Sequence, residues 1–208
     1  MAELIEIHPA DPQPRLLKRA AEMIRDGALV AFPTDSAYAL GGHLGDAALL
    51  DRIRRIRGVD DRHHFTLMCR DLSEIATYAR VDNAQYRLLK ATTPGAYTFI
   101  LEGTRELPRR VLHPKRKTIG LRVPDHRLVL RLLEELDEPL LSSTLSLPGD
   151  DAPLSDAEII EARIGGLLDL IIDCGPCRPQ ATTVVNLVGG SPELVRAGRG
   201  SLQPFGLE

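Results

Sequence analysis

Pro33-Thr34-Asp35-Ser36-Ala37-Tyr38-Ala39-Leu40-Gly41 (PTDSAYALG) is the most informative stretch of the chain. The apolar run 28–32 precedes it and is typical of a short buried strand that ends at the proline. Small polar side chains and a tyrosine therefore follow the carboxyl end of a strand, where ligands of α/β sheets usually bind. Hydroxyls and a carboxylate suit a small polar ligand such as an amino acid. A Pro–Asp turn with local side-chain hydrogen bonds would explain the same residues without a ligand.

Strand and helix patterns alternate on both sides of this stretch. Short apolar or alternating runs predict strands, and apolar residues at helical spacing or behind a capping residue predict helices. The predicted strands are residues 4–8 (an edge strand), 28–32, 65–69, 97–101, 118–123, 139–144, 168–173, 183–188 and 193–196. The predicted helices are residues 11–26, 46–57, 82–90 and 125–136, with two more opening at capping boxes at 71–74 and 155–158. This order is typical of an α/β or α+β fold with a mixed sheet, and we expect a single domain over residues 1–208.

The composition of the chain is that of an average globular protein, with 208 residues, 43% hydrophobic and 26% charged. It excludes disordered and collagen-like classes. No apolar run approaches the roughly 18–20 residues that cross a bilayer, so no membrane association is expected. Three cysteines, an odd number, argue against a disulfide framework and predict a reducing, cytoplasmic setting. Aromatic residues make up only 4%, which disfavours the stacking of bases on aromatic side chains.

Charge is unevenly distributed along a chain whose formal net charge is −3. Residues 52–70 hold six Lys/Arg against two Asp, and residues 105–122 hold seven against one Glu. Two basic blocks on an acidic chain predict a polyanion site, either for nucleotide phosphates or for a nucleic-acid backbone. The alternative is that both blocks are solvated surface.

The usual nucleotide and nucleophile motifs are missing from the sequence: there is no P-loop, no G-x-G-x-x-G after a strand and no G-x-S-x-G. Cys174 and Cys177 have the spacing of a redox or metal pair. They follow a late strand and lack a second pair, so a structural turn is favoured over redox or metal chemistry. We predict no dedicated metal site, no nucleophile and no general base.

Six segments, taken in order, resemble one known family. They are PTDSAYALGG (33–42), TPG leading into 97–101, TIGLRVP (118–124), residues 140–149, ATTVVNL (181–187) and RAG (196–198). Together they resemble the YrdC-like family, the threonylcarbamoyl-AMP synthases. Further stretches (IHP at 7–9, HHFTLMCRDLSE at 63–74 and STLSLPG at 143–149) are most similar to the YciO branch of that family.

This resemblance implies a fold and a reaction. The fold is an open, twisted mixed sheet curling round a large concave, positively charged cavity. The reaction converts ATP, L-threonine and bicarbonate to threonylcarbamoyl-AMP and pyrophosphate, for the threonylcarbamoyladenosine modification of tRNA, with Mg²⁺ carried by the ATP. The chain would then be a nucleotidyltransferase that binds ATP or AMP. The alternative is a non-catalytic protein that binds double-stranded RNA or tRNA in the same basic cavity. The oligomeric state is not predicted.

The resemblance also assigns residues one by one. Those matched to substrate binding are Thr34, Asp35, Ser36, Tyr38, Arg122 and Thr182. Those matched to nucleotide binding are Arg57, Arg62, His63, Ser143, Thr144, Ser146 and Arg196. Two motifs depart from the family pattern: the second cation of K-x-R is replaced by Val59, and the asparagine of S-x-N by Ser146. We expect Arg62 or His63 to substitute for the missing cation, and each lost contact to cost roughly one or two decades in affinity or rate.

Overall fold

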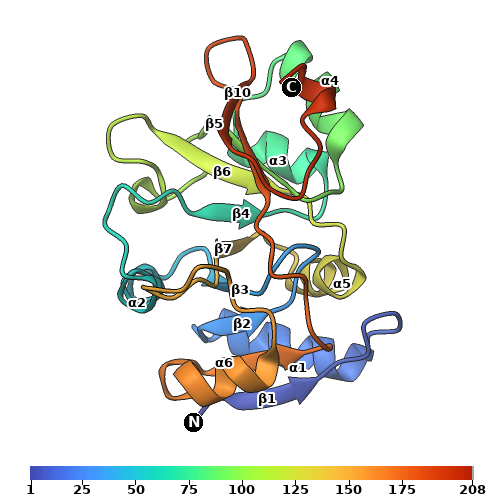
Figure 1. Cartoon of the computed structure of the whole chain (residues 1–208), viewed down its shortest axis with the longest axis vertical. Coiled ribbons are helices and arrows are strands. Elements are labelled where there is room, and N and C mark those ends of the chain that lie inside the picture. Colours follow the sequence, from blue (N-terminus) through green and yellow to red (C-terminus); the bar gives the residue numbers. More distant parts are fainter. Residues whose placement is uncertain (208) are drawn as a thin grey trace.

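The computed structural model describes residues 1–207 and contains one mixed sheet of ten strands (Figure 1). From edge to edge the strands follow the order β1-β8-β2-β3-β7-β4-β6-β5-β9-β10. The mixed α/β class predicted from the sequence is therefore confirmed. The strands are β1 (Glu3–Glu6), β2 (Val30–Phe32), β3 (Ala39–His43), β4 (Thr66–Met68), β5 (Tyr97–Glu102), β6 (Thr118–Arg122), β7 (Leu140–Thr144), β8 (Leu170–Asp173), β9 (Thr183–Asn186) and β10 (Glu193–Arg196).

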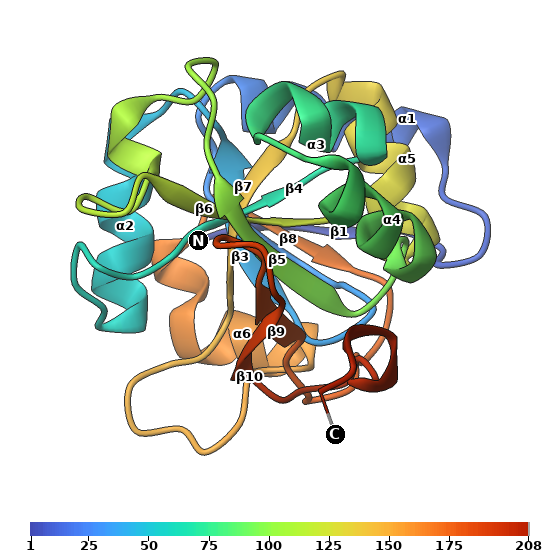
Figure 2. The same ribbon diagram turned by 90° about the horizontal axis from the view of Figure 1, so that it is seen from above.

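Helices cover both faces of this sheet. They are α1 (Pro14–Arg25), α2 (Ala47–Arg57), α3 (Leu72–Tyr78), α4 (Asn83–Thr92), α5 (Arg127–Leu136) and α6 (Ala157–Ile164), with 3₁₀ turns at Arg109–Val111, Gly165–Leu167 and Gln203–Phe205. Figure 2 shows α2 on one side of the molecule and α1 with α5 on the other. Within residues 1–207, no helix has the length and apolar character needed to cross a membrane.

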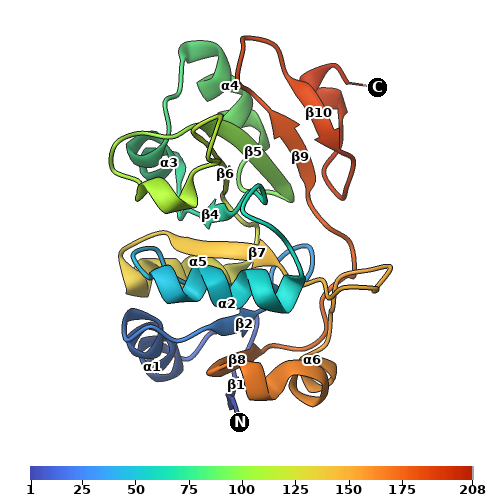
Figure 3. The same ribbon diagram turned by 90° about the vertical axis from the view of Figure 1, so that its left-hand side faces the viewer.

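Two buried apolar clusters hold these layers together, one on each face of the sheet. Strand β8 contributes residues to both clusters. Leu170 and Ile172 pack with α1 and α5, whereas Ile171 packs in the larger cluster that includes α2 and α6. Alternate residues of a strand point to opposite faces, so one short apolar strand serves both clusters. Figure 3 shows the result as a column of strands with α2 lying across its middle, beside β7.

Strand β3 was missed by the sequence analysis, which treated residues 33–41 as a ligand loop after one strand. In the structure only residues 33–38 form the loop, and β3 returns antiparallel to β2, pairing Ala39 with Phe32 and Gly41 with Val30. A side chain at Gly41 would place its Cβ 2.5 Å from the carbonyl oxygen of Leu141 on β7. Close backbone packing therefore requires the glycine that weakens the strand pattern.

One of the two predicted helix starts is shifted by one residue, and the other is at the predicted position without a complete capping box. Asp156 rather than Ser155 caps α6, accepting from Glu158 N at 2.9 Å. Asp71 caps α3 as predicted, but the Glu74 carboxylate accepts from Arg70 N at 2.7 Å, one residue before the cap. A complete capping box occurs instead at Asp82, where α4 begins.

Candidate functional site

The loop between β2 and β3 is closed by its own hydroxyl groups. Thr34 Oγ1 donates to Ala37 O at 2.6 Å and accepts from Ser36 N at 3.1 Å. Thr34 and Ser36 are almost fully buried, and Tyr38 is completely so. The Pro–Asp turn with local hydrogen bonds is therefore present, and it presents these side chains to the interior rather than to solvent.

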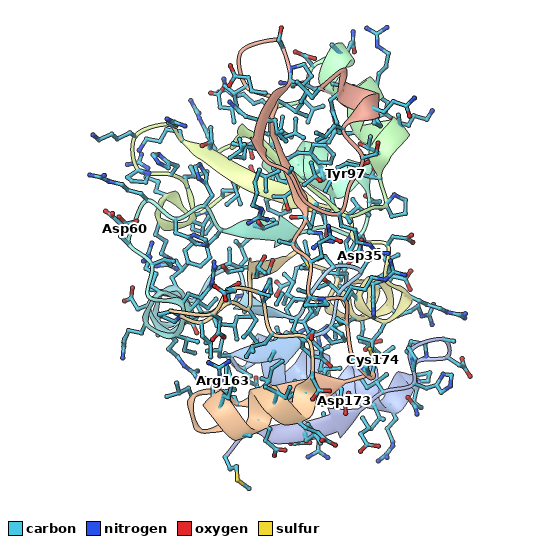
Figure 4. The ribbon with its side chains drawn as sticks, in the orientation of Figure 1. Asp35, Asp60, Tyr97, Arg163, Asp173 and Cys174 are labelled. Atoms are coloured by element: carbon cyan, nitrogen blue, oxygen red, sulfur yellow. The ribbon has the colours of Figure 1, made fainter. Side chains whose placement is uncertain are left out.

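Arg122 at the end of β6 forms a buried ion pair with Asp35, and both side chains are about 5% exposed. Arg122 also donates to Ser36 Oγ at 3.3 Å, while Asp35 accepts from Asp125 N at 3.1 Å. Burial lowers the pKa of Arg122, and the Asp35 charge opposes that shift. Arg122 Nε is buried without a hydrogen-bond partner, which leaves a donor for a ligand. Figure 4 shows Asp35 and Tyr97 on the side of the molecule opposite Asp60.

Five of the six predicted substrate residues line one narrow pocket of about 20 Å³: Thr34, Ser36, Tyr38, Arg122 and Thr182. Asp35 does not line this pocket, because its carboxylate lies behind Arg122. Its part in the site is to hold the guanidinium. The pocket shares Thr66, Thr98, Thr144 and Thr182 with a second, larger cavity, so the two adjoin.

The larger cavity has a volume of about 480 Å³ and contains all seven predicted nucleotide residues: Arg57, Arg62, His63, Ser143, Thr144, Ser146 and Arg196. They come from the end of α2, the loop before β4, the end of β7 and β10. Sequence reasoning missed Thr66 and Thr98, for which the only available signal was a hydroxyl within each of the apolar strands β4 and β5. It also missed Gly120, where a Cβ would lie 2.9 Å from Thr66 Oγ1 and fill the cavity floor.

Arg57 is held in this cavity by neutral groups alone. It donates through Nη1 to Ser143 Oγ at 2.7 Å and contacts His63 Nε2 at 2.9 Å, and its Nε lies 3.5 Å from Ser146 O. Arg196 similarly donates to Thr182 O at 3.0 Å. Among residues 1–207 no carboxylate forms an ion pair with either guanidinium. Burial lowers the pKa of Arg57, and the neighbouring Arg196 adds to this.

The pKa of His63 is expected to lie far below that of an ordinary histidine. Burial, followed by the Arg57 charge, lowers the pKa of His63 from 6.5 to about 4, with His64 and Arg54 acting the same way and Asp60 opposing. Folding stability should therefore rise with pH between about 4 and 6.5, because the unfolded chain binds the proton more tightly there. An NMR titration of the His63 ring protons would measure the pKa on which this expectation rests. A pKa near 6.5 would contradict the expectation. His63 thus does not replace the missing K-x-R cation at neutral pH, whereas Arg62 lines the cavity as a cation.

The two basic blocks meet at the edge of the larger cavity, because His64 lines it and contacts the second block. His64 from the first stacks on His113 from the second, with ring centroids 4.8 Å apart. No residue of 105–117 lines the cavity, and of the second block only Arg122 reaches the adjoining narrow pocket. The basic residues from which a polyanion site was predicted are thus divided between the cavity, at Arg57, and the β5–β6 loop.

The Cys174–Cys177 turn follows β8, next to Asp173 (Figure 4). Cys177 Sγ donates to Thr34 O at 3.4 Å, and Tyr38 Oη donates to Gly175 O at 3.4 Å. Both cysteines are free thiols, and burial raises the pKa of Cys174 to about 12 and that of Cys177 to about 11. The turn thus packs against the loop between β2 and β3, which favours the structural interpretation, and the raised pKa values disfavour the thiolate form that redox chemistry needs.

Alkylation of these two thiols is expected to be slow. Relative to an exposed thiol with a pKa of 9.0, the raised pKa values reduce the thiolate fraction at pH 7.5 about 100- to 1000-fold. Iodoacetamide labelling followed by mass spectrometry, with an unstructured cysteine peptide as the reference, measures the ratio. Labelling as fast as that of the peptide would contradict the burial argument.

A resident metal ion does not fit the site. Across residues 1–207 no group of three or more His, Cys, Asp or Glu side chains is arranged to hold one. The larger cavity is lined by cations, hydroxyls and apolar groups, without a carboxylate. Hard cations such as Mg²⁺ take oxygen ligands, so a magnesium ion would have to enter on the phosphates of a substrate.

Known proteins are similar to this chain in both sequence and structure. The family model Sua5/YciO/YrdC, described as telomere recombination, matches residues 22–198. The uncharacterized protein YciO of Escherichia coli K12 is 50% identical over 205 residues, covering 99% of this chain and 100% of that protein. The crystal structure of E. coli YciO superposes with a TM-score of 0.96 over 99% of this chain and 100% of that one.

More distant relatives are named for an enzymatic activity. The threonylcarbamoyl-AMP synthase of Pyrococcus abyssi is 29% identical over 184 residues, covering 88% of this chain and 54% of that protein. The structure of P. abyssi Sua5 complexed with L-threonine superposes with a TM-score of 0.87 at 26% identity, covering 95% of this chain and 58% of that one. This chain therefore spans about half the length of those relatives. The resemblance read from the sequence is confirmed, and the chain belongs to the Sua5/YciO/YrdC family.

Proposed function

We propose that this protein binds ATP and L-threonine and joins them through bicarbonate as threonylcarbamoyl-AMP, releasing pyrophosphate, in the cytoplasm and in support of tRNA modification. The distant relatives named as threonylcarbamoyl-AMP synthases favour this reaction. The P. abyssi Sua5 structure with L-threonine favours that acid.

The observation that carries the proposal is a pair of adjoining cavities, narrow and wide, each with its own cations. In the narrow cavity, Arg122 offers its free Nε beside the hydroxyls of Ser36 and Thr182, which suits the carboxylate and polar groups of a small amino acid. In the wide cavity, Arg57 and Arg196 carry charge that no carboxylate of residues 1–207 offsets, which suits a polyphosphate.

The chemistry then depends on positioning. The threonine amine first condenses with bicarbonate to a carbamate, and a water molecule leaves. A carbamate oxygen then attacks the α-phosphorus of ATP, the new O–P bond forms, and the bond to the departing pyrophosphate breaks. Arg57 and Arg196 are placed to offset the charge that develops on the leaving group. Magnesium enters as part of the MgATP substrate. This scheme requires no protein nucleophile, and the lining provides hydroxyls and cations.

The test is to incubate the protein with MgATP, L-threonine and bicarbonate and to measure threonylcarbamoyl-AMP and pyrophosphate by chromatography and mass spectrometry. Thr182→Val, which removes one cavity hydroxyl at constant shape, is expected to lower kcat/KM roughly 10- to 100-fold. Thr77→Val removes an equivalent hydroxyl on the exposed surface of α3 and is the matched control. Absence of product, together with no MgATP binding at millimolar concentration in calorimetry, would refute the proposal.

RNA binding is the second candidate, and the stack of His64 on His113 favours it because it joins the two basic blocks into one surface. A protein that uses this surface for RNA should bind a double-stranded RNA oligomer with affinity that falls steeply as salt rises. Lys115→Gln combined with Arg116→Gln should then weaken RNA binding and leave MgATP binding unchanged, because neither residue lines the cavity. A flat response to salt would exclude this candidate.

A further inference from the structure

Arg57 and Arg122 are two cavity arginines with opposite environments. Arg122 is paired with the Asp35 carboxylate, so its charge is offset within the protein. Arg57 contacts His63 Nε2, Ser143 Oγ and Ser146 O, and none of these groups carries a negative charge. A carboxylate in place of His63 would hold the guanidinium equally well, so the neutral acceptor needs a separate explanation.

The hydrogen bonds determine the protonation state of His63. An arginine guanidinium has donors and no lone pair to accept with, so His63 Nε2 is the acceptor and the ring proton resides on Nδ1. Ser143 Oγ lies 2.9 Å from the same nitrogen. The ring also lies edge-on to Phe65, with centroids 5.5 Å apart at an interplanar angle of 83°, which fixes its orientation. His63 is thus a rigid, neutral acceptor directly beside Arg57.

We propose that His63 is a positioning residue that holds Arg57 toward the cavity without offsetting its charge, so that the full positive charge is kept for a polyphosphate anion. The identity of that anion as the phosphates of ATP rests on the proposed function. The electrostatic role of His63 depends only on the contacts among His63, Arg57 and Ser143. The arrangement destabilises the ligand-free protein, because the partly buried charge of Arg57 lacks a partner. The same unpaired charge favours the binding of an anion.

This role predicts that replacing His63 with a carboxylate improves stability and harms binding. In His63→Glu the introduced carboxylate can pair with Arg57, so the melting temperature of the ligand-free protein is expected to rise by about 2–4 °C. Pyrophosphate binding, measured by calorimetry, is expected to weaken about 100-fold, because Arg57 is offset and the anion meets a like charge.

The conservative variant separates electrostatics from packing. His63→Gln retains a neutral acceptor, so its affinity for pyrophosphate is expected to stay within about threefold of the original and its melting temperature to show no rise. His8→Gln, in the exposed loop after β1 and outside the cavity, is the matched control. A purely structural histidine would make both His63 variants less stable than the original protein.

A double-mutant cycle assigns the effect to Arg57. In an Arg57→Met background, His63→Glu is expected to give no rise in melting temperature. If the rise persists there, or if His63→Glu lowers the melting temperature in the original background, the proposal is overturned. These stability measurements need no ligand, so they decide the role of His63 even if the protein makes no threonylcarbamoyl-AMP. Equal loss of pyrophosphate binding in the Glu and Gln variants would also overturn it.

Discussion

Replacing Arg122 with methionine is expected to destabilise the fold by about 3–5 kcal/mol, the usual cost of leaving one partner of a buried ion pair alone. Asp35 would keep a carboxylate that is about 6% exposed, with only the Asp125 amide to stabilise it. The loss is large compared with a typical total stability of about 5–15 kcal/mol. Urea denaturation followed by circular dichroism measures it.

The double variant Arg122→Met with Asp35→Asn is the control, because it removes both charges. We expect it to recover most of the lost stability while still failing to bind L-threonine, since the free Nε and the fork of Arg122 are gone. If the double variant is as unstable as the single one, packing rather than charge accounts for the loss. If it binds L-threonine normally, Arg122 does not contact the acid.

The fold was predictable where local patterns are strong and ambiguous where tertiary packing decides. Helix α5 has apolar residues on one face, and β8 is a continuous apolar run, so both were predicted from the sequence. Strand β3 contains Gly41 and Gly42, which lack the side chains that a strand pattern depends on. Their small size is required by the neighbouring β7 backbone, and a single sequence contains no signal for that contact.

The sequence predicted which residues belong to the candidate site better than it predicted what those residues do. Of the thirteen site residues that motif resemblance identified, twelve line the two adjoining cavities, and Asp35 is the exception because its carboxylate lies behind Arg122. The sequence also led to the expectation that Arg62 or His63 substitutes for the missing cation. Burial and the adjacent Arg57 keep His63 neutral instead, and both causes arise only in the folded chain. Thr66 and Thr98 enter the cavity because β4 and β5 flank β6 in the sheet, an order that a linear pattern does not contain.

Replacing both Arg57 and Arg196 with methionine is expected to weaken MgATP binding about 10²- to 10⁴-fold. Each guanidinium can give the phosphates a charge-assisted hydrogen bond, and each such bond contributes about 1.5–3 kcal/mol. Unlike Arg122, neither side chain has a carboxylate partner among residues 1–207, so their removal leaves no unpaired acid behind. The melting temperature is therefore expected to stay the same or rise.

Calorimetry with MgATP and a thermal melt of the same preparation test both expectations together. Arg131→Met is the control, because the Arg131 side chain is exposed on α5, pairs with Glu134 and lines neither cavity. Weaker binding with unchanged stability identifies Arg57 and Arg196 as anion ligands, because their charge then acts on the substrate rather than on the fold. A fall in melting temperature of the size expected for Arg122→Met would show instead that the two arginines support the structure. Unchanged binding would place the triphosphate elsewhere and would contradict the proposed function directly, since that proposal assigns the phosphates to Arg57 and Arg196.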